Sequence, residues 1–196
     1  MIAIFVVTYI NYGLIYGAAG IDVSKARVPF FNTLFSGLYP DYKALWFEDF
    51  GKTIVWTMLS NMIWPLIEFP IFYGLRLLYR MIDQCSLCPG RPKKTRSKTI
   101  QAFIEIYSGP EFEFHYKYSY ILVVIFVTFT YGAAIPILFP IAFLSLSFLY
   151  ITERFLIFYS YREPPMYSTK SNLMALKVMK YAPIIYCINA AWLFSN

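Results

Sequence analysis

Charged residues are scarce in this chain and long apolar runs are plentiful. Asp, Glu, Lys and Arg make up 14% of the 196 residues, whereas 59% are hydrophobic and 21% are aromatic. Average globular proteins carry about 25% charged residues. A soluble core could bury one apolar run, but several runs of spanning length indicate that lipid surrounds much of the chain.

The chain is also poor in residues that bind metals. It has one histidine and three cysteines. Cys85 and Cys88 form a single C-x-x-C, and Cys187 lies in an apolar run. A tetrahedral zinc site needs a second pair of cysteines or matching histidines. We therefore expect two cytoplasmic thiols and no metal or other cofactor.

The single histidine closes a short acidic motif. Glu111, Glu113 and His115 alternate and can line one side of an extended segment. Without a fourth ligand, a solvated face explains them better than a metal. Membrane-embedded carboxylate pairs at helical spacing, a nucleophile elbow and a phosphate loop are all missing, so we expect no enzymatic activity.

The excess of positive charge does not indicate nucleic-acid binding. The formal net charge is +6 and the isoelectric point is near 9.1. The cations gather in loops beside apolar runs, as the positive-inside rule describes for membrane proteins. No basic face alternates with stacking aromatics, so we expect no nucleic acid as a partner.

The apolar runs predict an all-α, polytopic membrane helix bundle in one domain with about five transmembrane helices. The predicted helices cover residues 1–19, 53–79, 119–135, 137–159 and 181–195. The third and fourth form a tight hairpin over residues 119–160. Gly132, Pro136 and Pro140 mark its turn, because glycine loosens a helix and proline removes a backbone donor.

The loop at residues 84–98 carries the strongest topological signal. Its basic residues place it in the cytoplasm and make it a candidate for binding anionic lipid. A plain topology signal is the favoured interpretation. The residues concerned are Arg91, Lys93, Lys94, Arg96 and Lys98.

Polar residues recur on one face of the first predicted helix. Thr8, Asn11, Tyr12 and Tyr16 follow helical spacing. They face either neighbouring helices or an aqueous path.

The second predicted helix carries a similar stripe. Thr57, Asn61 and Glu68 lie close to one face, and Pro65 and Pro70 should bend or locally open the helix. An intramembrane carboxylate usually faces a bundle interior or a water-filled cavity. Alternatively, Glu68 is protonated or only joins neighbouring helices.

Residues 116–196 resemble a known family of ion channels. The segments YKYSYILVVIFVTFTYG, PILFPIAF, ERFLIFYSY and APIIYCINAAWLFS are similar to the C-terminal membrane region of the OSCA-type calcium-permeable, stress-gated cation channels. These channels are relatives of the anoctamins and of the transmembrane channel-like proteins. The family's gate helix typically contains glycine, whereas residues 53–79 contain Pro65 and Pro70, with Gly74 near the end.

The resemblance implies a pore lined by several helices of each subunit and opened by membrane tension or osmotic stress. Residues 53–79 would form the gate helix, flanked by residues 1–19 and 119–135. It also implies a permeant cation, lipid contacts, a homodimer or larger assembly, and a multi-pass location that favours the plasma membrane. The family's chains are several times longer, so we expect this chain to be part of a longer protein.

The residues alone leave two other functions open. A lipid scramblase on the same scaffold would use a polar groove open to lipid. A non-conducting structural subunit of a membrane complex would explain a short, aromatic-rich chain with a basic loop.

Overall fold

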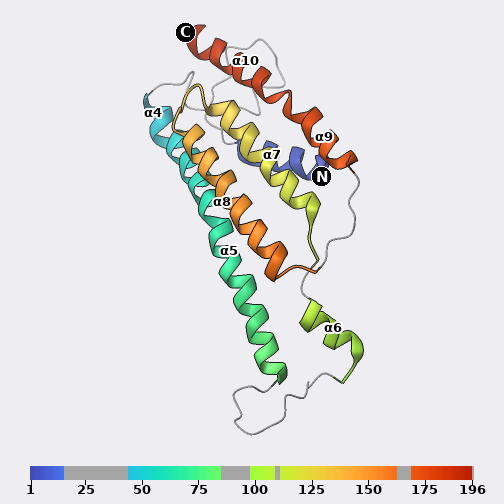
Figure 1. The fold of residues 1–196 in the computed structure, drawn as a ribbon. Helices are drawn as coiled ribbons and strands as arrows, with labels where there is room; N and C mark the ends of the chain where they lie inside the picture. Colours follow the sequence, from blue (N-terminus) through green and yellow to red (C-terminus); the bar gives the residue numbers. More distant parts are fainter. Residues whose placement is uncertain (16–43, 85–97, 109–110, 163–168, 196) are drawn as a thin grey trace.

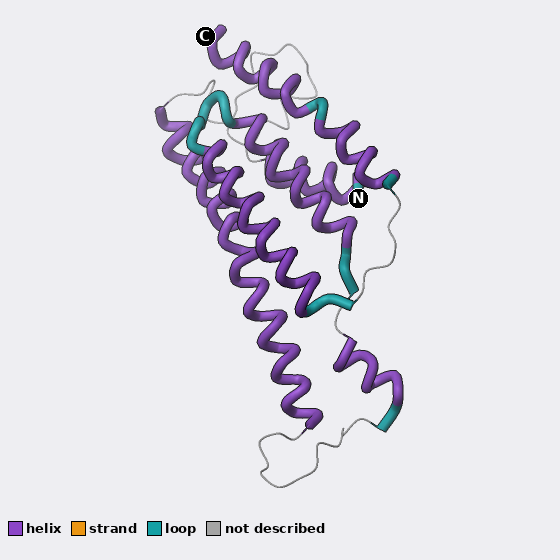
Figure 2. Tube along the Cα trace, in the orientation of Figure 1, coloured by secondary structure: helices purple, strands orange, loops and turns teal. Residues whose placement is uncertain are grey.

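A computed structural model describes residues 1–15, 44–84, 98–108, 111–162 and 169–195. Every regular element in these ranges is a helix (Figure 2). The all-α prediction is therefore confirmed for the described part of the chain.

The helices are named in chain order, with the labels of Figure 1. The first half contains α1 (Ile2–Tyr9), the π-helical η1 (Ile10–Ile15), α4 (Ala44–Trp46), η2 (Phe47–Gly51) and α5 (Lys52–Gln84). The second half contains α6 (Ile100–Ser108), α7 (Phe114–Tyr131), α8 (Leu138–Tyr159), α9 (Lys170–Met179) and α10 (Ala182–Ser195).

Helix α7 is the centre of the apolar core. Its buried residues include Leu122, Val124 and Phe126, and α1, α8, α9 and α10 all contact it. Buried residues on α8 recur at helical spacing, from Leu138 through Ile141 to Leu156. This spacing places them on one face, so α8 has a buried side and an exposed side.

Hydrogen bonds to α7 hold the N-terminal segment at both ends. Ser119 Oγ donates to the carbonyl of Met1 at 2.9 Å, and the Tyr131 hydroxyl donates to the carbonyl of Gly13. Since these two bonds lie at opposite ends of α7, α1 and η1 run along this helix. The polar stripe that begins at Thr8 is thereby fixed beside the core.

The turn between α7 and α8 depends on close packing at Gly132. A Cβ atom at this position would lie 2.5 Å from the Thr128 carbonyl oxygen and 2.7 Å from the Phe139 ring. Only glycine fits there without displacing its neighbours. Pro136 lies in the turn and Pro140 in the first turn of α8, where a missing N–H costs little. The structure ends α7 at Tyr131, before the predicted boundary at residue 135.

Helix α5 is long and unbroken. It continues from Lys52 to Gln84 through both Pro65 and Pro70, and so extends beyond the predicted end at residue 79. With 33 residues it is about 50 Å long. It packs mainly against α8, which lies beside it in Figure 1. Many of its large apolar side chains remain exposed, among them Trp56 and Trp64.

Arginine side chains fasten the last turns of α5 to two other helices. Arg76 Nη1 donates to the carbonyl of Tyr159 at 2.8 Å and also to that of Ser160. Its Nη2 donates to the carbonyl of Tyr107 at 3.0 Å, as does Arg80 Nη2. These carbonyls lie at the ends of α6 and α8, where a helix leaves its last acceptors without internal partners.

Two helices are long and apolar enough to cross a membrane. They cover Phe47–Asp83 and Leu138–Tyr159. Ile2–Gly13 is apolar but shorter, and α10 has 14 residues. The predicted bundle of about five membrane-spanning helices is therefore not confirmed.

Helix α9 occupies a segment that we expected to be a loop. Lys170–Met179 contains helix-forming Leu, Met, Ala and Lys residues. Ala175 is buried and belongs to the apolar core. Contact with α7 therefore stabilises a helix that the apolar runs of the sequence did not predict.

Candidate functional site

An open cavity of about 770 Å³ lies among the helices. Side chains of α1, η1, α5, α7 and α8 line it, together with the segment that precedes α7. The α5 wall consists of Asn61, Trp64, Pro65, Glu68 and Phe72, whose spacing places them on one side of the helix. The cavity is thus built from segments far apart in the sequence.

The two polar stripes of the sequence meet at this cavity. Thr8 and Tyr12 line it from the N-terminal segment, and Asn61 and Glu68 line it from α5. The Tyr120 hydroxyl of α7 donates to the backbone carbonyl of Asn61 at 2.6 Å, joining α7 to the α5 wall. This arrangement places polar groups of three segments around one space.

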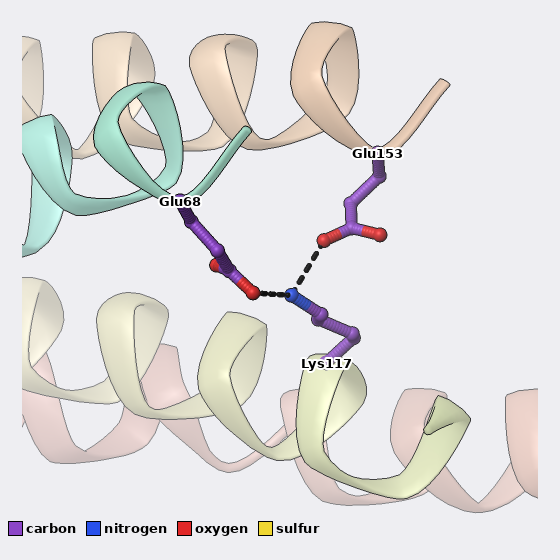
Figure 3. A network of polar contacts seen from close by, with 3 residues as sticks. All are labelled: Glu68, Lys117 and Glu153. Carbon is purple, nitrogen blue, oxygen red and sulfur yellow. Dashed lines mark hydrogen bonds and ion pairs between the residues drawn. The ribbon is translucent and has the colours of Figure 1, made fainter. Parts of the chain in front are cut away.

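Glu68 belongs to a charged cluster that joins three helices (Figure 3). The ammonium group of Lys117 on α7 lies 3.0 Å from Glu68 Oε1 on α5 and 2.6 Å from Glu153 Oε1 on α8. The three side chains are only 18%, 16% and 13% exposed, respectively. Partly buried charges are costly to desolvate and are tolerated when paired in this way.

The charged cluster joins three helices and also forms part of the cavity wall. Glu68 and Lys117 line the cavity, whereas Glu153 is not part of its wall. One cation between two carboxylates leaves a net negative charge. The cluster therefore makes this side of the cavity attractive to cations.

Further carboxylates lie where the chain enters α7. Glu111 and Glu113 line the cavity, and both residues are exposed. His115 does not line it, because α7 begins at Phe114 and rotates the next side chain away from the extended alternation. The three alternating residues therefore do not share one face.

Tyr161 covers the cavity just after the end of α8. Burial, reinforced by the nearby Glu153 carboxylate, raises the pKa of its phenol to about 12. The hydroxyl is therefore neutral at physiological pH and contributes no charge to the cavity.

The remaining candidates from the sequence lie elsewhere. Thr57 is outside the cavity wall, and its hydroxyl donates to the Thr53 carbonyl at 2.8 Å. Gly132, Pro136 and Pro140 lie at the opposite end of α7 from Lys117. Among the five candidate lipid-binding residues, Lys98 is exposed, and the four others lie outside the described residues, as do Tyr16 and the C-x-x-C motif.

Sequence reasoning missed Lys117 and its ion pairs with Glu68 and Glu153. The sequence did contain a signal for the pairing of Lys117 with Glu153, because these two residues lie about equally far from the turn between α7 and α8. In an antiparallel hairpin such residues lie at the same level. Intramembrane charges also tend to pair with one another.

In the residues that the structure describes, these features define a helical protein with a charged, aromatic-lined cavity. No family model, curated protein or solved structure matches the chain. The resemblance to the OSCA-type channels stays a prediction.

Proposed function

We propose that the chain is a multi-pass membrane protein, and that it forms all or part of a tension-responsive, calcium-permeable cation channel. The observation that carries the proposal is the cavity, which polar residues of the N-terminal segment (Thr8 and Tyr12) and of α5 (Asn61 and Glu68) line together. In a membrane, polar groups in these numbers require water or one another. A wet cavity with an excess of carboxylates would favour cations over anions.

The exposed apolar surface supports a membrane location. Large apolar side chains cover much of the outside of α5 and α8, including Trp56 at 72% and Phe143 at 70% exposure. Such extended apolar surface marks a membrane or a protein interface. The long α5 exceeds the hydrocarbon thickness of about 30 Å, and its last turns carry Arg76, Arg80 and Asp83. Those turns would then lie at the cytoplasmic surface.

Gating requires two states that differ in their response to tension. Tension favours the state that occupies more membrane area, and it shifts the equilibrium only as far as the two states differ. We assign the movement to α5, because its helix contains Pro65 and Pro70. Tilting of α5 against α8 would widen the cavity beside Asn61 and Glu68.

The test is current through liposome patches that contain the purified chain, recorded under suction. We expect cation currents, and we expect Glu68→Gln to reduce the preference for cations over anions. Glu48→Gln is the matched control, because Glu48 is an exposed carboxylate that belongs neither to the charged cluster nor to the cavity wall. Unchanged current and selectivity in Glu68→Gln would exclude Glu68 from the pore.

One observation favours the second candidate, a non-conducting structural subunit of a membrane complex. Glu68 is engaged by Lys117 at 3.0 Å, which suits a residue that holds helices together. This function predicts no current at any tension, while substitutions in the charged cluster still weaken assembly. The patch experiment therefore separates the two functions.

A further inference from the structure

We infer that the cavity binds an alkylated ammonium group of the choline type. The inference goes beyond conduction, because such a site can be occupied whether or not ions pass through the chain. It rests on three observations. Aromatic rings surround the cavity, carboxylates outnumber cations in its wall, and Lys117, the one lysine among the lining residues, is already paired with two carboxylates.

Aromatic rings line the cavity from four segments of the chain. They come from η1, α5, the first turns of α7 and the residues after α8; they are Tyr12, Trp64, Phe72, Tyr116, Tyr120 and Tyr161. The face of an aromatic ring carries negative charge density and attracts cations within about 6 Å of its centre. Cages of such rings recognise quaternary ammonium groups.

Three of these rings are available to a ligand. Tyr12, Trp64 and Tyr116 are 41%, 59% and 57% exposed. None of the three pairs with another aromatic ring in the described part of the chain. Their faces are therefore not already used for packing against other rings.

The charges on the wall favour a cation over an anion. Glu68, Glu111 and Glu113 line the cavity. Lys117 is the opposing cation, but its ammonium group is held between Glu68 and Glu153. A phosphate or carboxylate ligand would meet uncompensated carboxylates, whereas a cation would neutralise them.

An organic cation fits this wall better than a metal ion does. Calcium takes six to eight oxygen ligands, and the described residues contain no group of three or more His, Cys, Asp or Glu side chains that could hold a metal. A trimethylammonium group instead uses ring faces and diffuse negative charge. The volume of about 770 Å³ falls within the usual range of small-molecule sites.

Two sources can supply this group, a soluble amine or the headgroup of phosphatidylcholine. The experiment measures binding of radiolabelled choline to the full chain in nanodiscs of phosphatidylglycerol, with empty nanodiscs as background. We expect saturable binding. We also expect 3,3-dimethylbutan-1-ol, which has the shape of choline without its charge, to compete at least about tenfold less well.

Nanodiscs of phosphatidylcholine distinguish the two sources. If choline binding is lost in them, the lipid headgroup occupies the cavity; if binding persists, the ligand is a soluble amine. Both outcomes support the inference. Absence of saturable binding in phosphatidylglycerol, or equal competition by the uncharged analogue, would overturn it.

Substitutions locate the binding. Tyr116→Leu should weaken choline binding about fivefold, the usual size of one ring's contribution. Tyr150→Leu is the matched control, because Tyr150 on α8 is 65% exposed and lies outside the cavity wall. Both changes are on the surface, so both variants should keep their helical circular dichroism. Equal choline binding by the two variants would place the ligand elsewhere and overturn the inference. Since the assay needs no current, its failure and a failure of conduction are distinguishable.

Discussion

The ammonium group of Lys117 lies 2.6 Å from the carboxylate of Glu153, which joins the beginning of α7 to the last turns of α8. The same ammonium group reaches Glu68 on α5 at 3.0 Å. A single lysine thereby connects three helices at one level of the bundle (Figure 3). The consequences for stability can be measured separately from any transport.

Replacement of Lys117 by methionine should destabilise the protein strongly. Methionine keeps the length of the side chain but leaves two partly buried carboxylates facing each other without a cation. Removing one member of a buried ionic cluster costs about 3 to 5 kcal/mol, and the residual exposure of 13% to 18% places the expected loss near the lower figure. Thermal unfolding in detergent measures it.

The control for that experiment is Lys52→Met. Lys52 lies 3.7 Å from Glu48, but both side chains are largely exposed, at 72% and 63%. Such pairs contribute about 0 to 1 kcal/mol, so little change is expected. Equal unfolding temperatures for both variants would show that the charged cluster contributes no more than a surface pair.

Two glycine substitutions should act in opposite directions. Gly132→Ala places a methyl group 2.5 Å from the Thr128 carbonyl oxygen and should cost about 1 to 3 kcal/mol through overpacking. Gly74→Ala meets no atom within 4 Å and should stabilise α5 by about 0.5 to 1 kcal/mol. Both are measured by thermal unfolding. A gain in stability from Gly132→Ala would contradict the packing described at the turn.

Arg76→Lys should loosen the ends of α6 and α8 although it keeps the charge. The guanidinium group reaches carbonyls of Tyr107, Tyr159 and Ser160 with two nitrogens, and a single ammonium group cannot span them. The loss of charged hydrogen bonds should cost roughly 2 kcal/mol. Faster amide hydrogen exchange at the ends of α6 and α8 would show it.

Arg154→Lys is the control for Arg76→Lys, because Arg154 on α8 is exposed. We expect no change in exchange at α6. If both variants exchange alike, the three carbonyls do not depend on Arg76.

The sequence allowed the helical class and two polar residues of the cavity wall, Asn61 and Glu68, to be predicted, whereas the candidate Thr57 lies outside that wall. Gly132 and Pro136 predicted the break between α7 and α8, and helical spacing placed Asn61 and Glu68 together on α5. These are local patterns, and periodicity reports them directly.

Features that depend on packing were not predictable in the same way. Helix α5 extends beyond its predicted end at residue 79 to Gln84, and Arg76 and Arg80 in its last turns contact the ends of α6 and α8. Residues 170–179 form a helix because Ala175 meets the core. The charged cluster of Glu68, Lys117 and Glu153 depends on how α5, α7 and α8 align along their lengths. The sequence of one helix does not contain this information.

The central claim is that the cavity beside Asn61 is filled with water when the chain lies in a membrane. The direct measurement is modification of Asn61→Cys by a charged, membrane-impermeant thiol reagent in liposomes, with the three native cysteines replaced by serine. The matched control is Ile63→Cys on the same helix, at a position that is 45% exposed and outside the cavity wall.

The account predicts rapid modification of Asn61→Cys by the charged reagent. Ile63→Cys should react only with an apolar maleimide, because its side chain would face lipid. Protection of Asn61→Cys from the charged reagent, with or without tension, would contradict the account and would favour a structural subunit sealed against its partner helices.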